Sequence, residues 1–428
     1  MQPTVLSIGL SSIRLRAALA IFAVALFVAG TAASQETVLH SFGNGSDGEG
    51  PQAGLVQDDA GNLYGTTAVG GIHQYGTVFE LSPREGGGWT ETVLHSFNRN
   101  GTDGAYPYAG LVLDAAGNLY GTTTSGGIHT CDGIYAGCGT IFELSPRQGG
   151  GWTETVLHSF GSLADGYYPY AGLIFDSHGN LYGTTFGGGI HGYGTAFELT
   201  PREGGGWTET VLHSFGNGTD GVSPDAGLIF DSLGNLYGTT NAGGIHNAGT
   251  AFELSPREGG GWTETVLHSF GNGSDGANPD AGLVLDGHGN LYGTTLAGGI
   301  HTCLNYNCGT VFELSPEEGG GWTERVLHSF NENGSDGAHP VADLIFDAAG
   351  NLYGTTLDGG IHTYYGAVFE LSPAEGGNWT ERVLHSFGNG TDGVSPYAGL
   401  IFGSTGNLYG TTTAGGIHGG GTVFQITP

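Results

Sequence analysis

Two titratable residue types recur at fixed positions along this chain of 428 residues. The histidines end the phrase Gly-Gly-Ile-His (GGIH) and are His73, His129, His191, His246, His301, His362 and His418. The aspartates begin the dipeptide Asp-Gly and are Asp47, Asp103, Asp165, Asp220, Asp275, Asp336 and Asp392. Imidazole and carboxylate groups can hold a metal ion or move a proton. An enzyme needs one asymmetric set of acid, base and orienting groups, so seven equivalent copies favour a structural role over catalysis.

We therefore expect the GGIH histidines to bond to loop backbone, with metal or ligand binding as the alternative. The Asp-Gly aspartates are expected to cap turns; calcium is the alternative, although their spacing falls short of an EF-hand loop. Another histidine recurs in the phrase VLHSF. In one copy, His158 shares a strand face with Val156 and Phe160, which predicts a satisfied contact between neighbouring units.

One position breaks this regularity and is our candidate ligand site. The residue after proline in each Pro-x-Ala phrase differs between copies, and the seven residues are Gln52, Tyr108, Tyr170, Asp225, Asp280, Val341 and Tyr397. Tyrosines can stack on sugar or aromatic faces, and the neighbouring carboxylates can accept hydrogen bonds or hold a cation. Asp225 and Asp280 could also serve as general acid and base, although no motif supports catalysis. The remaining alternative is unselected variation on a solvated rim.

The elements that must position these side chains are copies of one repeat. The phrase VLHSF begins at residues 38, 93, 156, 211, 266, 326 and 383. The phrase GNLYGTT keeps step with it and begins at residues 61, 117, 179, 234, 289, 350 and 406. A third phrase, close to GTVFELSP, also occurs once in each unit. A period of 55 to 63 residues therefore governs nearly the whole chain.

Each unit reads as four short strands, which the second unit shows well. The expected strands, rich in β-branched and aromatic residues, are 109–114, 118–123, 140–145 and 152–160. Asp114 to Gly117 suits a hairpin turn, and Pro146 with the following glycines ends the third strand. Each repeat is thus expected to be a four-stranded antiparallel meander.

The two ends of the repeat region are complementary. Residues 36–42 supply a fourth strand with no third strand before it, and the chain closes with a third strand, GTVFQITP, with no fourth after it. If these fragments pair, the fold is an all-β, seven-bladed β-propeller whose ring is closed by the N-terminal strand. An open solenoid of the same repeat would need no such complementary ends.

The N-terminal residues differ from the repeats and predict export. Arg14 and Arg16 precede an apolar run from Ala17 to Gly30 and then small residues, which is typical of a secretory signal peptide spanning 1–33. Residues 34–428 would then form a single propeller domain, extracytoplasmic and either periplasmic or secreted. The run is short for a membrane span, so a permanent N-terminal anchor is the alternative reading.

The four cysteines lie in two insertions at the same place in two repeats. In an oxidising compartment we expect local disulfides from Cys131 to Cys138 and from Cys303 to Cys308, each stabilising by about 2–3 kcal/mol. A zinc site is the alternative, but two whole units separate the two pairs.

Charge limits the possible partners. The chain has 40 acidic residues and nine arginines, giving a formal charge of −31, and loss of Arg14 and Arg16 would change this to −33. Nucleic acids and anionic membranes need clustered basic residues, so both are poor partners. Neutral glycans, cations or proteins at the cell exterior fit better, and the acidity itself can serve solubility alone. We expect a monomer.

The combination GNLYGTT, GG, GTVFELSP, VLHSF, DG and P-x-AGL resembles the Gloeobacter–Verrucomicrobia repeat of exported bacterial proteins, over residues 36–428. The resemblance implies an exported repeat protein with no assigned biochemical activity. Three functions stay open: a non-catalytic binding or scaffold propeller, with multivalent carbohydrate binding as its sharpest version; a hydrolase or lyase acting at the channel mouth; and a structural envelope protein. We favour the first, with no catalysis and no cofactor except, as a weaker alternative, calcium.

Overall fold

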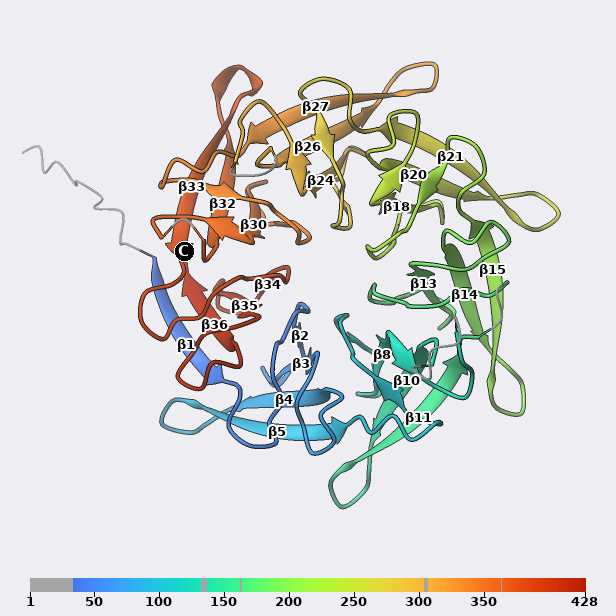
Figure 1. Ribbon diagram of the computed structural model, residues 1–428, viewed down its shortest axis with the longest axis vertical. Helices are drawn as coiled ribbons and strands as arrows, with labels where there is room; N and C mark the ends of the chain where they lie inside the picture. Colours follow the sequence, from blue (N-terminus) through green and yellow to red (C-terminus); the bar gives the residue numbers. More distant parts are fainter. Residues whose placement is uncertain (1–33, 132–136, 162–163, 304–306, 363) are drawn as a thin grey trace, which may run out of the picture. The chain divides into compact units, whose positions relative to one another are not determined.

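The computed structural model describes residues 34–131, 137–161, 164–303, 307–362 and 364–428. These residues form seven four-stranded antiparallel sheets arranged as the blades of one ring (Figure 1). The predicted all-β, seven-bladed propeller is therefore confirmed. The expected signal peptide, residues 1–33, lies outside the described residues. Within the described ranges, no helix is both long and apolar enough to cross a membrane.

The strands of each blade follow one another from the channel outwards. Blade 1 has β2 (Val56–Gln57), β3 (Leu63–Thr67), β4 (Thr77–Pro83) and β5 (Trp89–Ser96). Blade 2 has β7 (Val112–Leu113), β8 (Leu119–Thr123), β10 (Thr140–Pro146) and β11 (Trp152–Ser159). Blade 3 has β12 (Ile174–Phe175), β13 (Leu181–Thr185), β14 (Thr195–Pro201) and β15 (Trp207–Ser214). Blade 4 has β17 (Ile229–Phe230), β18 (Leu236–Thr240), β20 (Thr250–Pro256) and β21 (Trp262–Ser269). Blade 5 has β23 (Val284–Leu285), β24 (Leu291–Thr295), β26 (Thr310–Pro316) and β27 (Trp322–Ser329). Blade 6 has β29 (Ile345–Phe346), β30 (Leu352–Thr356), β32 (Ala367–Pro373) and β33 (Trp379–Ser386), with the short 3-10 turn η1 (Glu375–Gly377) between the last two.

Blade 7 closes the ring with strands from both ends of the repeat region. It contains β34 (Ile401–Phe402), β35 (Leu408–Thr412), β36 (Thr422–Thr427) and, on its outer edge, β1 (Gln35–Ser41). Strands β1 and β36 lie side by side (Figure 1) and are antiparallel. Val38 is opposite Phe424 in their register. The predicted closure by the N-terminal strand is therefore correct.

The innermost strands are shorter than the sequence predicts, and four small ladders were not predicted. Strand β7 covers two residues of the expected 109–114. The Asp-Gly loop and the GG loop instead pair with each other in β6–β9 (Gly104–Ala105 and Ser125–Gly126), β16–β19 (Gly221–Val222 and Ala242–Gly243), β22–β25 (Gly276–Ala277 and Ala297–Gly298) and β28–β31 (Gly337–Ala338 and Asp358–Gly359). These ladders tie together the loops at the end of the ring where the Pro-x-Ala phrases lie.

Phenylalanine rings form the contact between adjacent blades. The phenylalanine of each VLHSF phrase packs against the phenylalanine of the FELSP, FELTP or FQITP phrase in the next blade, as Phe160 does against Phe197, with ring centroids 5.3 Å apart. The seven pairs are Phe42–Phe79, Phe97–Phe142, Phe160–Phe197, Phe215–Phe252, Phe270–Phe312, Phe330–Phe369 and Phe387–Phe424. All of these rings are fully buried. Aromatic burial of this size makes the largest apolar contribution at each interface.

A glycine makes room for one ring of every pair. In blade 3, Gly183 of β13 lies opposite Phe197 of β14, and a Cβ on this glycine would come within 2.7 Å of the ring. The corresponding glycine and phenylalanine are in register in the other six blades. The second glycine of GNLYGTT is therefore required by packing within the sheet.

The VLHSF histidines make the contact between neighbouring units that the sequence predicts, through the Asp-Gly loop that leads into the next blade. A bulge in the outer strand accompanies each of them, and the imidazole faces the aspartate of this following loop. In blade 3, the Nε2 of His213 lies 3.1 Å from an oxygen of Asp220, and this carboxylate also accepts the amide of Gly216 at 2.8 Å. Aspartates of the other Asp-Gly loops likewise accept loop amides, as turn-capping residues do.

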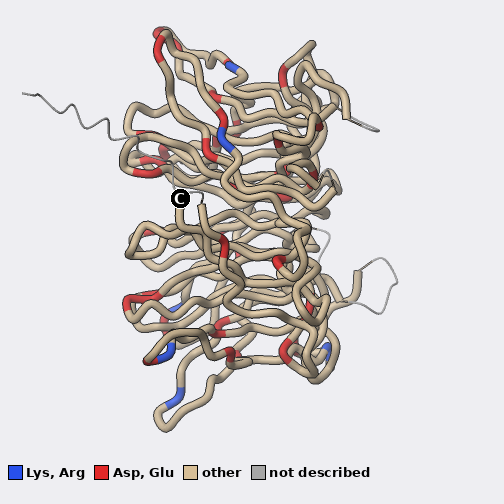
Figure 2. Tube along the Cα trace, turned by 90° about the vertical axis from the view of Figure 1, so that its left-hand side faces the viewer, with Lys and Arg blue, Asp and Glu red and all other residues tan. Residues whose placement is uncertain are grey.

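Acidic residues are spread along the depth of the ring (Figure 2). Seven glutamates have unusual surroundings. They are Glu36, Glu91, Glu154, Glu209, Glu264, Glu324 and Glu381. The Oε1 atom of each is buried and has no hydrogen-bond partner among the described residues. For Glu154, burial raises the pKa from 4.5 to about 7, and the charge of Asp103, in the loop from blade 1 to blade 2, adds to the rise, opposed by His95. The folded ring thus favours the protonated form of these side chains.

This arrangement predicts that the ring loses stability as the pH rises from about 5 to about 8. A carboxyl group whose pKa is higher in the folded than in the unfolded chain binds more protons when folded. Its contribution to stability is therefore fully present below the pKa of the unfolded chain and is lost as the pH rises through the pKa of the folded chain. The triple variant Glu91→Gln, Glu154→Gln and Glu209→Gln removes three of the seven glutamates. The loss of stability with rising pH should become smaller in about the same proportion. Thermal unfolding followed across this pH range measures the effect, and a melting temperature that rises with pH would contradict it.

The closure of blade 7 generates a second prediction. Deleting residues 36–42 from a chain of residues 34–428 leaves the edge of β36 unpaired and removes Phe42 from its contact with Phe79. We expect aggregation or a melting temperature lower by at least several degrees, since an open sheet edge pairs readily with other chains. Light scattering and thermal unfolding measure both. An unchanged melting temperature with a monodisperse sample would mean that ring closure contributes little.

Candidate functional site

The Pro-x-Ala phrases reach the channel mouth because the preceding blade holds their backbone. In blade 2, the hydroxyl of Thr122 donates a 3.0 Å hydrogen bond to the carbonyl of Ala171 in blade 3. The corresponding bond is present at all seven interfaces, including Thr411 to Ala53, which closes the ring. Because this carbonyl is occupied by a threonine of another blade, the phrase lies outside the ladder of its own sheet. This explains why the innermost strands are short.

The proline of each phrase is held in the same way. A Cβ added to Gly139 would lie 2.6 Å from the Cδ of Pro169, and an equivalent glycine faces each of the other prolines. The residue before proline has a positive φ in every copy; Tyr168, for example, has φ 58°. Its amide donates to Cys138 at 2.9 Å and its carbonyl accepts from Phe186 at 3.0 Å, so surrounding bonds fix this rarely used conformation. The backbone is therefore the same in seven copies, and only the residue after proline is free to differ.

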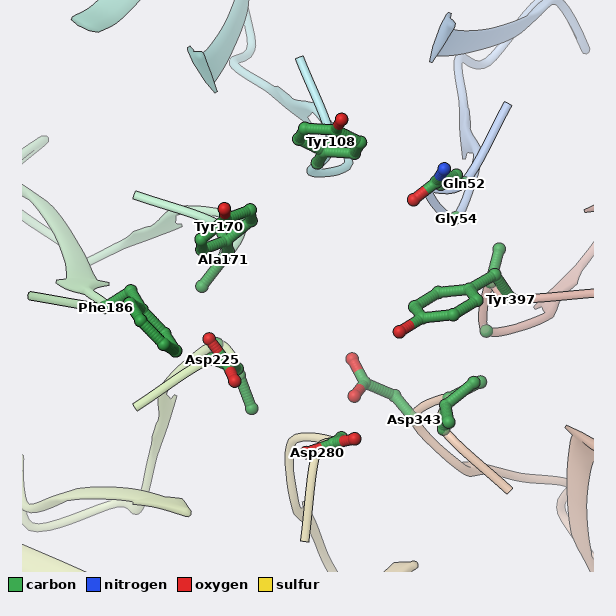
Figure 3. Close-up of a pocket in the computed structure, with 17 residues that line it drawn as sticks. Gln52, Gly54, Tyr108, Tyr170, Ala171, Phe186, Asp225, Asp280, Asp343 and Tyr397 are labelled. Carbon is green, nitrogen blue, oxygen red and sulfur yellow. The ribbon is translucent and has the colours of Figure 1, made fainter. Parts of the chain in front are cut away.

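All seven predicted residues line a single pocket at the channel mouth. Its volume is about 390 Å³, within the range typical of small-molecule sites. Figure 3 shows side chains from several blades pointing towards a shared central space. Val341 is buried in the wall, whereas Tyr170 and Tyr397 remain about 40% exposed. The structure thus brings the predicted set together around one opening.

The pocket has an aromatic side and an acidic side (Figure 3). Tyr108 and Tyr170 have ring centroids 5.8 Å apart, and the ring of Phe186 lies 5.6 Å from that of Tyr170. The carboxylate of Asp225 lies beside Phe186, those of Asp280 and Asp343 follow it around the opening, and the hydroxyl end of Tyr397 points towards this acidic side. This asymmetry can orient one ligand within a framework that is otherwise repeated seven times.

Two residues that line the pocket, Phe186 and Asp343, were not predicted from the sequence. Phe186 directly follows a GNLYGTT phrase, where the other copies have smaller side chains. Asp343 occupies the position after Pro-x-Ala, which is glycine in the other six copies: Gly54, Gly110, Gly172, Gly227, Gly282 and Gly399. Comparing the repeats position by position would have revealed both, because each is an exception beside an otherwise constant phrase.

The carboxyl groups of the pocket are all disposed towards their protonated forms. Burial raises the pKa of Asp225 from 3.8 to about 7, and the charge of Asp280 contributes to the shift. Burial also raises the pKa of Asp280, and a hydrogen bond from the side chain of Asn241 partly offsets this. Solvent reaches Asp343 through the channel although protein surrounds it. That enclosure raises its pKa, against a 2.6 Å hydrogen bond from the amide of Gly282. Among the described lining residues there is no lysine, arginine or histidine to balance these acids.

The GGIH loops display their side chains to solvent at the same end of the ring. The seven isoleucines are Ile72, Ile128, Ile190, Ile245, Ile300, Ile361 and Ile417, with exposed fractions of 64–78%. Every GGIH histidine is also exposed, and in the described ranges no hydrogen bond from these imidazoles to loop backbone is found. The VLHSF serines hold the loops instead, as when Ser214 Oγ accepts the amide of Ile190 at 2.7 Å.

Both predicted disulfides are present, and they support the rim of the site. Cys131 is bonded to Cys138 and Cys303 to Cys308, and all four residues are buried. The carbonyl of Cys308 accepts the amide of His339, just as Cys138 accepts that of Tyr168. The four cysteines are therefore more deeply buried than the sequence suggested. In the part of the chain that the structure describes, no group of three or more His, Cys, Asp or Glu side chains is placed to hold a metal ion.

Comparisons with known proteins identify the repeat. A family model described as the Gloeobacter/Verrucomicrobia repeat matches residues 25–133, 128–319 and 301–428. A search of curated proteins found no match.

Solved structures resemble the chain only distantly. One, named as a putative 6-phosphogluconolactonase from Bacteroides uniformis, is 14% identical, with a TM-score of 0.51 over 82% of this chain and 88% of that one. Another, named as a putative oxidoreductase (glucose dehydrogenase) from Thermus thermophilus, is 16% identical, with a TM-score of 0.43 over 92% of this chain and 100% of that one. The first likeness concerns the fold alone.

Proposed function

The chain belongs to the Gloeobacter/Verrucomicrobia repeat family, and we propose that this member is an exported propeller that binds one small organic ligand at its channel mouth without transforming it. The observation that carries the proposal is the asymmetric pocket of about 390 Å³ within a framework of seven equivalent blades. Two disulfides suggest an oxidising, extracytoplasmic setting, which agrees with the signal peptide expected from the sequence.

The aromatic side of the pocket supports a ligand with a flat or weakly polar face. Tyr108, Tyr170 and Phe186 form a continuous series of rings, and the first two have hydroxyl groups that can also donate hydrogen bonds. Sugars and related hydroxylated molecules combine such a face with hydrogen-bonding groups. A single site at the channel mouth is better supported than one weak carbohydrate site per blade, since the lining residues differ between blades.

A hydrolase or lyase is less well supported by this geometry. Asp225 and Asp280 would be its acid and base, and such a pair works best when its surroundings drive the two pKa values apart. Burial instead raises the pKa of Asp225 and of Asp280 in the same direction. A binding role makes no such demand on the two carboxyl groups.

A scaffold role is the second candidate, and the exposed isoleucines of the GGIH loops favour it. Seven apolar side chains at equivalent places on one end of a ring suit repeated contacts with a protein partner. The two candidates are separable because pocket substitutions would leave such contacts unchanged, whereas Ile72→Asp with Ile190→Asp would weaken them and spare the pocket.

Removing the two stacked tyrosines tests the proposed pocket. A glycan array probed with residues 34–428, with and without chelator, identifies sugar ligands for titration. The double variant Tyr108→Ala and Tyr170→Ala should weaken such a ligand about tenfold or more, because each ring contributes on the order of 1 kcal/mol to stacking. Calorimetry measures the affinity, and thermal unfolding shows whether the fold is intact.

Arg147→Ala is the matched control for this test. Arg147 lies in an exposed turn at the other end of blade 2, where its Nε donates to Thr153 at 2.6 Å, so its removal should leave binding unchanged. If Arg147→Ala weakens the ligand while the tyrosine pair does not, the binding site lies at the other end of the ring.

A further inference from the structure

We propose that the ligand of the central pocket carries a positive charge on an organic group, an ammonium centre held between the carboxylates of Asp225, Asp280 and Asp343 and the faces of the neighbouring tyrosines. This inference rests on the proposed function and names the chemical class of the ligand. The net charge of the chain left neutral glycans and cations open as ligands, and this inference selects an organic cation.

The first observation is that the three carboxylates have few partners of their own. Asp343 accepts one amide, from Gly282 at 2.6 Å, and Asp280 accepts the side-chain amide of Asn241. Neither donor carries a charge, and no basic residue stands among the described residues of the lining. Ionised carboxylates gathered in a partly enclosed space raise one another's free energy unless protons or a cation neutralise them, which is why burial and charge raise their pKa values. A neutral ligand would leave that repulsion in place.

The second observation is that Asp343 is an exception to its own repeat. The equivalent position is glycine in six blades, and there the backbones converge closely at the channel. A Cβ on Gly282 would approach Asp343 Oδ1 to 3.1 Å, and one on Gly399 would approach the carbonyl oxygen of Asp343 to 3.3 Å. The carboxylate of Asp343 points from this crowded ring into the central opening, beside Tyr397 (Figure 3). It adds a third acid where the rest of the framework would place no side chain.

The third observation is that aromatic side chains surround the acids around the opening. The face of a tyrosine ring attracts a cation, and the attraction increases when the cation is partly removed from water. Tyr397 lies close enough to the acids that their charges help to raise its pKa, after the larger effect of burial, so it stays neutral. Tyr108 and Tyr170 stand across the opening. An ammonium group with alkyl or sugar carbons can contact rings and carboxylates together.

A bare metal ion fits the pocket less well than an organic cation. Metal ions need several ligands converging at short distance, and among the residues that the structure describes no group of three acids, histidines or cysteines meets that requirement. The volume of about 390 Å³ is that of a small-molecule site. The aromatic wall would also have no role in holding a metal.

Two probes of nearly equal shape and different charge test the inference. Choline has a permanent positive charge, and 3,3-dimethylbutan-1-ol has a carbon in place of its nitrogen. Both should be titrated calorimetrically into residues 34–428 at constant ionic strength and pH 8, where Asp225 is largely ionised because its pKa is about 7. We expect choline to bind at least tenfold more tightly than the neutral alcohol.

The variant Asp343→Gly, which restores the residue found in the other six blades, should weaken choline binding about tenfold and leave the alcohol unaffected. Its melting temperature should not fall, since the same backbone accepts glycine six times. Should this variant nevertheless unfold, Asp343→Asn provides the same loss of charge at nearly equal volume. Arg147→Ala should change neither titration.

The possible outcomes separate this inference from the proposed function. If choline does not bind, or binds no better than the alcohol, the inference is overturned. If sugars or the alcohol nevertheless bind, and lose affinity in the Tyr108→Ala and Tyr170→Ala variant, the proposed pocket function stands without a cationic ligand. If choline binds but neither the Asp343 variants nor the tyrosine pair weaken it, the cation sits elsewhere, and both proposals fail for this pocket.

Discussion

The ring depends on the packing of one phenylalanine against another across each blade interface. A blade alone is a small sheet with a two-residue inner strand and two faces to cover, so it cannot bury enough apolar surface by itself. The phenylalanine of VLHSF covers the neighbouring face, and the glycine of GNLYGTT makes room for the ring it meets. The seventh interface needs residues from both ends of the repeat region, which is why Phe42 and strand β1 belong to the last blade and contact the first.

The same interfaces place the candidate site. A threonine of each blade holds the alanine carbonyl of the next Pro-x-Ala phrase, and a glycine receives its proline. Since the backbone is held from behind in this way, the side chain after proline can change without cost to the framework. Selection can then act on seven converging positions at the channel mouth. The deviations from sevenfold symmetry, including Phe186 and Asp343, therefore carry the chemistry, while the repeated residues carry the architecture.

The sequence was sufficient for the architecture because repeats, complementary ends and cysteine pairs are each local patterns. It also identified the rim from Gln52 to Tyr397, since an irregular position inside a regular phrase is visible without a structure. It failed where partners come from another blade or loop. His213 meets Asp220 beside a bulge in its strand, and a serine of the outer strand, not His191, holds the loop amide next to that histidine. The short strand β7 depends on a threonine in the preceding blade. Spacing along the chain reveals none of these three.

The central claim is that the blade interfaces hold the ring and that the pocket side chains do not. Denaturant unfolding of two variants compares these contributions directly. The first variant is Phe160→Ala, at one blade interface. The second changes six pocket residues together: Tyr108→Ala, Tyr170→Ala, Tyr397→Ala, Asp225→Asn, Asp280→Asn and Asp343→Gly. The account predicts that the single interface change lowers the free energy of unfolding by about 3–5 kcal/mol, and that the six pocket changes together cost less. A pocket variant less stable than Phe160→Ala would contradict it.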